Sequence, residues 1–181
     1  MNRRNGLFNS LILGPIAIGP TVAHYAYAEI YMSEEKAAKS FFPDLKLQRM
    51  ELKLNGELVN QIEKASGETV RSPELKIFKA STKDAVFIDQ VLGKHEFITY
   101  AVGIDSMGKV RGIEILEYRE TYGSQVRGED WKKQFVGKTS VSQLKIDKDI
   151  KGISGATLSS AHVTAGVRRL LQTYEHIKAN L

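Results

Sequence analysis

The strongest periodic pattern in the chain lies near its C-terminus, directly after Ser154-Gly155-Ala156-Thr157. Apolar residues recur there at a helical spacing and form a single stripe: Val163, Val167, Leu170, Leu171, Tyr174 and Ile177. A helix with one long apolar stripe has to bury it against a second layer. We therefore predict a long final helix that packs on the rest of the chain.

The middle of the chain favours a sheet as that second layer. Strand-like runs occupy Arg49–Leu54, Leu58–Ile62, Glu74–Lys79, Ala85–Val91, Glu96–Ile104 and Val110–Tyr118. The last two runs flank Asp105-Ser106-Met107-Gly108-Lys109, whose late glycine is typical of a β-hairpin turn. Short helices are predicted after Ser33, ending before Pro43, and over Glu129–Phe135. The predicted fold class is α+β: a single domain, mainly an antiparallel sheet with flanking helices.

Residues 1–28 form a separate segment. Basic Asn2-Arg3-Arg4-Asn5 precedes the largely apolar stretch Leu7–Val22, and Ala26-Tyr27-Ala28 fits the small-x-small pattern of leader peptidase. We predict a cleavable secretory signal peptide over 1–28, cut before Glu29, and one domain over 29–181. A retained membrane anchor is the alternative, although the apolar stretch is shorter than the roughly 20 residues that a spanning helix needs. Export without cysteine indicates a periplasmic location.

Composition excludes several kinds of chemistry. A chain without cysteine has no disulfide, thiolate metal site, iron–sulfur cluster or c-type haem attachment. The net charge of +5 falls to +3 (24 basic and 21 acidic residues) without the two leader arginines, and no basic run with interleaved aromatics indicates nucleic-acid binding. His24, His95, His162 and His176 lack metal-ligand spacing, so no metal site is predicted. Gly137-Lys138-Thr139 lacks the earlier glycine of a P-loop, and no dinucleotide fingerprint follows a strand.

The tetrapeptide before the final helix has two interpretations. Helix N-termini present unpaired N–H groups and a partial positive charge, and the small residues Ser154, Gly155 and Ala156 would let a phosphate approach the backbone closely. Thr157 would then carry a phosphate-linked group. The alternative is a polar turn that simply caps the helix, because Ser, Gly and Thr are common at helix starts. Helix physics alone leaves both interpretations open.

Ser154-Gly155-Ala156-Thr157 resembles the flavinylation motif of the FMN-binding domain family. That family includes the C subunit of sodium-translocating NADH:quinone oxidoreductase, the G subunit of the Rnf complex and small exported FMN-binding proteins. The resemblance implies that Thr157 is esterified to the phosphate of FMN. It also implies maturation outside the cytoplasm by a magnesium-dependent flavin transferase that uses FAD, in agreement with the predicted leader.

The resemblance extends over roughly residues 100–171. The predicted hairpin and the segment Gly112–Leu116 resemble the central strands of the family. Glu120-Thr121-Tyr122-Gly123 resembles its Glu-Thr-Pro-Gly loop, which implies that this loop lies beside the flavin ring, with Tyr122 stacking on it and Thr121 supplying a hydroxyl. Trp131 resembles part of the segment that follows, and we interpret it as a core residue rather than a flavin contact.

One position departs from the family pattern. The family usually has Asp three residues before the motif, where this chain has Lys151; Asp149 lies two residues earlier and Asp147 four. Either the transferase tolerates this change, which we favour, or the change blocks modification of Thr157. Lys151 and Lys138 are also candidate partners for the phosphate charge.

The sequence therefore predicts a periplasmic electron-transfer flavoprotein with FMN linked through a phosphodiester to Thr157. Because no nicotinamide site is found, we predict a carrier between periplasmic or membrane redox partners rather than a stand-alone catalyst, and no residue is assigned a catalytic role. Two alternatives stay open. One is a subunit of a membrane redox complex that keeps its N-terminal anchor, and the other is a non-redox binding module of the same fold.

Overall fold

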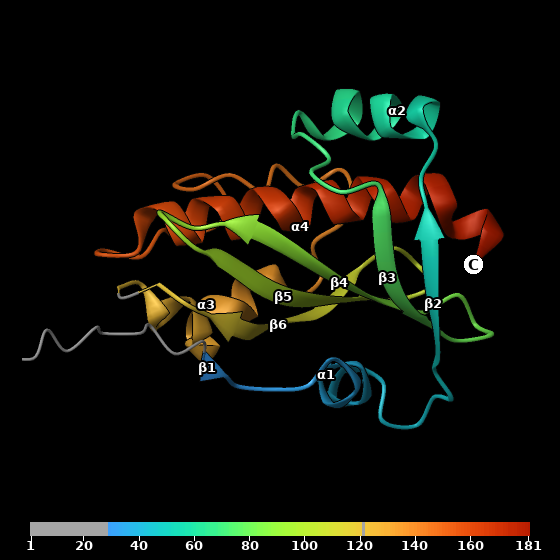
Figure 1. The fold of residues 1–181 in the computed structure, drawn as a ribbon, viewed down its shortest axis with the longest axis horizontal. Helices are drawn as coiled ribbons and strands as arrows, with labels where there is room; N and C mark the ends of the chain where they lie inside the picture. The colour runs from blue at the N-terminus through green and yellow to red at the C-terminus, as the bar shows by residue number, and fades with distance from the viewer. Residues whose placement is uncertain (1–28, 121) are drawn as a thin grey trace, which may run out of the picture.

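The computed structural model describes residues 29–120 and 122–181, which form one sheet with helices on both faces (Figure 1). Six strands lie in the order β1-β6-β5-β4-β3-β2, and every neighbouring pair is antiparallel. The strands are β1 (Glu29–Ile30), β2 (Gln48–Lys53), β3 (Glu74–Lys79), β4 (Ala85–Leu92), β5 (Phe97–Ile104) and β6 (Val110–Tyr118). The α+β class and the antiparallel sheet are thus confirmed, whereas the predicted leader lies outside the described residues.

Four α-helices accompany the sheet: α1 (Glu34–Phe41), α2 (Gly56–Ser66), α3 (Glu129–Lys132) and α4 (Thr157–Ile177). The Ser33 hydroxyl caps α1 by accepting a hydrogen bond from Lys36 N at 3.2 Å, as predicted. The predicted helix at 129–135 consists of α3 and a 3₁₀ turn over Lys133–Phe135. No helix among the described residues is long and apolar enough to cross a membrane.

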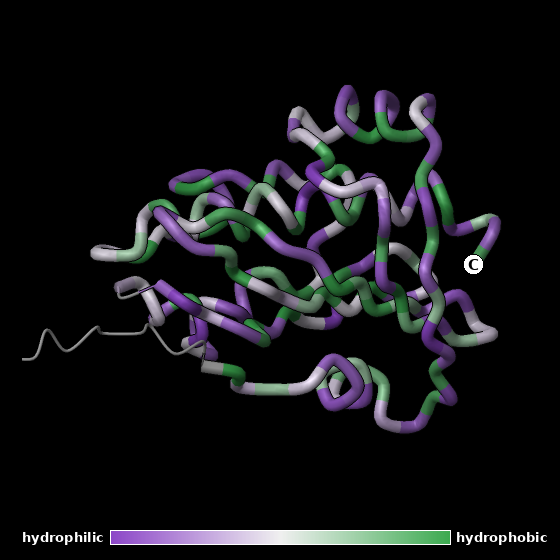
Figure 2. Tube along the Cα trace, viewed as in Figure 1, coloured by the Kyte–Doolittle hydropathy of each residue, from purple (hydrophilic) through white to green (hydrophobic). Residues whose placement is uncertain are grey.

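The predicted strand over 58–62 is wrong, because these residues lie in α2. Asn55 caps this helix by accepting a hydrogen bond from Leu58 N at 2.8 Å, and Gly67 ends it in the left-handed conformation with φ of 70°. The helical turn places Leu58 and Ile62 on one face, and Ile62 is fully buried. Figure 2 shows the outer turns of α2 in hydrophilic purple and its inner side in green. A short apolar run fits both the helical and the strand period, and here the two caps determine that the segment is a helix.

Helix α4 lies across one face of the sheet and α1 across the other (Figure 1). All six residues of the predicted α4 stripe are buried, so the strongest sequence prediction is confirmed. On the opposite face, Phe41 covers Gly103 and Gly112, which pair with each other across β5 and β6. A Cβ atom on Gly103 or Gly112 would come within 2.8 or 2.9 Å of the Phe41 ring, so the aromatic ring needs glycine beneath it.

A buried polar network fixes α4 to the sheet. The Arg169 guanidinium forms an ion pair with the Asp89 carboxylate of β4 and also donates to Thr69 O at 2.8 Å. The Tyr100 hydroxyl of β5 donates to the same carboxylate at 2.7 Å. Burial, followed by the negative charge of Asp89, holds the pKa of Tyr100 well above its usual value. Helix α4 and the two central strands therefore meet at one carboxylate.

Candidate functional site

The start of α4 is an uncapped helix N-terminus at the surface. The helix begins at Thr157, and its N-cap residue Ala156 offers no side chain to the first-turn N–H groups. Gly155 has φ of 81°, a backbone conformation that favours glycine. The interpretation of Ser154-Gly155-Ala156-Thr157 as a side-chain cap is therefore not what the structure shows. Among the described residues no side chain caps the first-turn N–H groups of α4, and the positive end of the helix dipole lies beside the exposed Thr157, as an anion site requires.

Four hydroxyl side chains surround this helix start, and two of them are exposed. Ser159 and Ser160 are buried; the Ser160 hydroxyl donates back to Thr157 O at 3.0 Å. Ser154 and Thr157 are exposed to solvent. Of these two, Thr157 belongs to the first turn of the helix itself. The side-chain oxygens of Ser154 and Thr157 are therefore the two at this end of α4 that are accessible for a phosphate ester. The Thr157 oxygen lies at the positive end of the helix dipole.

Tyr118 joins the predicted loop to the helix start. Its buried hydroxyl, at the end of β6, donates to Tyr122 O at 2.6 Å and lies 3.0 Å from Ser159 Oγ on α4. Burial raises the pKa of Tyr118, so this hydroxyl stays protonated. The structure thus brings together the two segments that the sequence proposed as one site. Sequence reasoning missed Tyr118, whose signal is its place two residues before the loop on an otherwise apolar strand face.

Gly123 permits this close approach between loop and helix. It has φ of 97°, and a Cβ atom there would overlap the Tyr118 hydroxyl and lie 3.3 Å from Ala156 Cβ. The Tyr122 side chain beside it is 82% exposed. Thr121, which was predicted to supply a hydroxyl, lies outside the described residues.

The Glu120 carboxylate faces the β4–β5 hairpin. It accepts hydrogen bonds from the backbone N–H groups of His95 at 2.6 Å and Glu96 at 3.1 Å. Burial opposes ionisation, but the backbone N–H groups of His95, Glu96 and Lys94 outweigh it and hold the pKa of Glu120 below its usual value. Glu120 therefore positions the loop by tying it to a neighbouring turn.

We expect Glu120→Gln to loosen this tie. Glutamine lacks the negative charge of the carboxylate that accepts these two hydrogen bonds. The backbone N–H groups of His95 and Glu96 should therefore exchange with solvent about tenfold faster at neutral pH. In the wild type the tie should be complete above pH 4.5 and be lost as the pH falls through the lowered pKa of Glu120. Amide NMR of both chains measures these effects, with Glu117→Gln as the matched control. Unchanged exchange in Glu120→Gln would show that the β4–β5 hairpin is stable without the Glu120 carboxylate.

Comparison with known proteins finds a family that the segment around this site resembles. Residues 93–172 match the model of the FMN-binding domain. The chain is 32% identical over 84 residues to the G subunit of the Na⁺-translocating ferredoxin:NAD⁺ oxidoreductase complex of Acetobacterium woodii. That match covers 41% of this chain and 41% of the relative, so the chain spans less than half of the relative's length.

A solved structure also resembles the chain. It is the crystal structure of the C subunit of Na⁺-translocating NADH-quinone reductase from Parabacteroides distasonis, with a TM-score of 0.45 and 16% sequence identity. The match covers 77% of this chain and 84% of that one.

Trp131 forms part of the hydrophobic core near the candidate site. Its side chain is 6% exposed and its ring lies 4.9 Å from that of Phe135 in an edge-to-face contact. The indole N–H donates to Lys151 O at 3.0 Å, and the Gln134 amide oxygen accepts from Lys151 N at 2.8 Å. Trp131 and Gln134 thus fix the backbone of the segment that leads to the motif, while the Lys151 side chain is exposed.

Asp149 is already engaged within the loop before the motif. Its carboxylate accepts hydrogen bonds from Leu144 N at 3.1 Å and Lys145 N at 3.0 Å, and pairs with Lys138 Nζ at 3.3 Å. Burial opposes this ionisation, but those hydrogen bonds and Lys138 keep the pKa of Asp149 low. Asp149 therefore does not take the place of the acid that the family has at 151, and Lys138 is turned toward Asp149.

Exposed side chains flank the helix start of the candidate site. Two hollows of about 760 and 200 Å³ in the described residues are lined by segments other than 154–157 and 120–123. Leu158, 46% exposed, and Tyr122 supply apolar area beside the helix start. An exposed hydroxyl, an uncapped helix and flanking apolar side chains are the residue types that fit a tethered flavin phosphate. In the described residues no group of three His, Asp or Glu could hold a metal ion.

Proposed function

We propose that the chain is a periplasmic electron carrier that holds FMN through a phosphodiester to Thr157. One observation carries this proposal: the Thr157 hydroxyl is exposed at the uncapped start of a 21-residue helix. The match of residues 93–172 to the FMN-binding domain supports FMN as the group that this site holds. The name of the relative from Acetobacterium woodii, a component of an oxidoreductase complex, supports electron transfer as its role.

The residues at the helix start have separate tasks in this proposal. On attachment, the Thr157 hydroxyl gives up its proton and forms a P–O bond to the FMN phosphorus, while the pyrophosphate bond of FAD breaks and AMP leaves. The first-turn N–H groups of α4 then face the remaining negative charge, which a helix N-terminus stabilises by about 0.3–1 kcal/mol. Leu158 and Tyr122 offer apolar surface to the ring. FMN supplies the redox chemistry when bound.

A covalent link makes retention of the cofactor independent of affinity. The Thr157 side chain is exposed to solvent, and a ligand that stays largely exposed is held weakly without a tether. An exported protein would lose a weakly held flavin by dilution. A tether at Thr157 would therefore keep the cofactor even where its binding is weak.

Intact-mass measurement of the exported chain tests this function. Cells that carry the flavin transferase should yield a chain that starts at Glu29 and has gained one FMN less one water, whereas cells without the transferase should yield the unmodified chain. A modified chain that retains residues 1–28 would instead favour the anchored subunit of a membrane complex. An unmodified, colourless chain from cells with active transferase would contradict the proposal and point to Lys151 as a block or to a non-redox module.

A further inference from the structure

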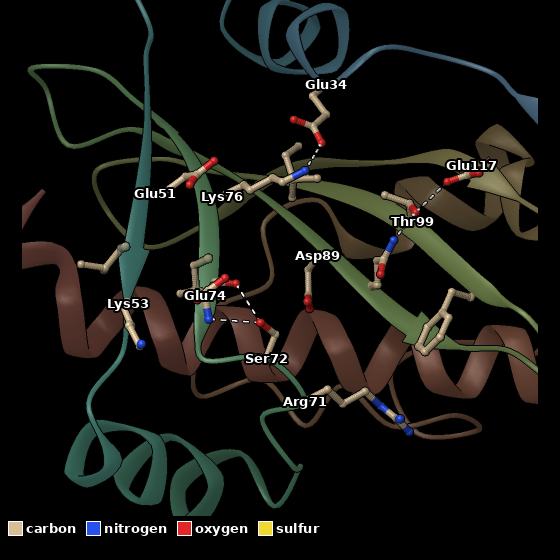
Figure 3. A pocket seen from close by; sticks show the side chains of 15 residues that line it. Glu34, Glu51, Lys53, Arg71, Ser72, Glu74, Lys76, Asp89, Thr99 and Glu117 are labelled. Atoms are coloured by element: carbon tan, nitrogen blue, oxygen red, sulfur yellow. Dashed lines mark hydrogen bonds and ion pairs between the residues drawn. The ribbon is translucent and has the colours of Figure 1, made fainter.

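The sheet opens between β3 and β4. Pairing of these strands ends at Lys76 and Ile88, although β4 continues to Leu92 and β3 begins at Glu74. Beyond Ile88, β5 is the strand that pairs with β4. Figure 3 shows the two strands diverging, with Glu74 and Asp89 on opposite sides of the gap.

Ser72 closes the β3 side of this opening. Continuing the register of Lys76 with Ile88 by two residues would place Glu74 opposite Gln90. Instead, the Ser72 hydroxyl accepts a hydrogen bond from Glu74 N at 3.1 Å and lies 3.3 Å from Glu74 O, to which it donates (Figure 3). The backbone N–H and carbonyl groups of Glu74 are therefore hydrogen-bonded to Ser72 and do not require a partner on β4.

The β4 side of the opening remains unpaired. Hydrogen-bonded positions alternate along an antiparallel pair, and the bond from Gly93 N to Glu96 O at 2.8 Å sets the phase for β4 and β5. Odd-numbered residues of β4 therefore face β5, and the backbones of Gln90 and Leu92 face the opening. The Leu92 carbonyl oxygen contacts the His162 ring. Within 29–120 and 122–181, the N–H groups of Gln90 and Leu92 and the carbonyl oxygen of Gln90 have no backbone partner. Such an edge is a template for an extended chain.

There is room for side chains on both faces of an added strand. On the α1 face of the sheet lies the cleft of about 760 Å³, with Phe97 47% exposed at its rim. On the α4 face lies the hollow of about 200 Å³, bordered by Val91 and His162. Arg71 lines both hollows, so the two spaces adjoin at the opening. Alternate side chains of an extended segment would enter one hollow and then the other.

Most carboxylates that line the larger cleft are already neutralised. Glu34 pairs with Lys76, Asp89 with Arg169 and Glu117 with Arg119, and Arg49 lies within ion-pair distance of Glu51. Of the charged side chains that line the cleft, Glu74, Lys53 and Arg71 enter no ion pair in the described residues (Figure 3). The unpaired charge of this lining is therefore positive, and it is complementary to an acidic side chain.

We propose that this opening binds an extended segment of a partner polypeptide, which pairs with the Gln90 and Leu92 edge of β4 and places an Asp or Glu beside Lys53 and Arg71. Backbone hydrogen bonds supply the affinity and the two hollows supply the side-chain selectivity, as in other cases of strand addition. The inference does not depend on the flavin, because no residue of the 154–157 motif lines the opening. A redox carrier that must find its partner would use such an edge for docking.

Gln90→Pro tests this edge directly. Proline removes the outward N–H of Gln90 and leaves the backbone hydrogen bonds with β5 intact, because proline is tolerated where the N–H faces away from the neighbouring strand. Both Gln90→Pro and Gln90→Ala lose the side-chain bond from Gln90 to Thr99. Gln90→Ala is the matched control, since it keeps the N–H and removes the side chain. A phage-displayed library of random heptapeptides is selected on the full chain and counter-selected on Gln90→Pro. Enriched peptides should contain Asp or Glu among β-branched residues and bind Gln90→Pro about tenfold or more weakly than Gln90→Ala.

Methylation of the peptide provides a second measurement that leaves the protein unchanged. N-methyl groups on the peptide edge that faces β4 should abolish binding, whereas N-methyl groups on the other edge should not. Failure to enrich peptides on the wild type over Gln90→Pro, or equal binding to both variants, would overturn the proposal. Enrichment of basic peptides would overturn the charge assignment. A wild-type dimer that Gln90→Pro converts to a monomer would identify a second copy of the chain as the occupant instead.

Discussion

Thr157→Ala is expected to abolish the attachment of FMN completely and to leave the fold intact. The substitution removes the hydroxyl oxygen that would bond to phosphorus, and no other hydroxyl side chain at this end of α4 combines exposure with a place in the first helical turn. Stability should change little, because the side chain is exposed and alanine is the best helix former. Intact mass and flavin fluorescence of the denatured chain measure the loss, and a thermal melt checks the fold.

Ser154→Ala is the matched control for this experiment. It removes the other exposed hydroxyl of the motif, three residues away and before the helix, so modification should persist. Tandem mass spectrometry of the wild-type peptide should place the added mass on Thr157. Full modification of Thr157→Ala, or added mass on Ser154, would show that our proposal assigns the ester to the wrong oxygen. Binding of the heptapeptides to β4 should survive in Thr157→Ala, which separates the two proposals.

Local patterns in the sequence predicted the elements that depend on local physics. The α4 stripe, the hairpin turn around Gly108 and the Ser33 cap each follow from residues within a few positions of one another, and all three are present in the structure. The run at 58–62 was assigned to the wrong element because five apolar-rich residues fit either period. Asn55 and Gly67 carry the deciding information, and both lie outside that run.

The candidate site was predictable as a set of segments but not as an arrangement. Family resemblance pointed to the motif and the loop, yet the roles of individual side chains depend on contacts between distant parts of the chain. Glu120 reaches a turn 24 and 25 residues earlier, and Tyr118 meets Ser159 from 41 residues away. No periodicity or spacing encodes such contacts. The open edge of β4 likewise depends on where β3 diverges, which Ser72 decides through its bonds to Glu74.

The second large effect is expected from Asp89→Ala, which should lower the free energy of unfolding by about 3–5 kcal/mol. The Arg169 side chain is 8% exposed, and loss of Asp89 leaves its guanidinium without a counter-ion in a buried setting. The Tyr100 hydroxyl loses its acceptor at the same time. In a domain of this size such a loss lowers Tm by about 10 °C. Urea and thermal unfolding of the full chain measure both quantities.

Two further variants show whether burial of the charge causes this loss. Asp130→Ala removes the same side chain from an ion pair with Lys133 in which the carboxylate is fully exposed, so it should leave Tm nearly unchanged. Asp89→Ala combined with Arg169→Met removes both charges, and it should recover much of the stability that Asp89→Ala loses, because the uncompensated guanidinium is gone. If Asp89→Ala were no more harmful than Asp130→Ala, the Arg169 guanidinium would have reached solvent. The polar network would then not be what holds α4, and with it Thr157, in register on the sheet.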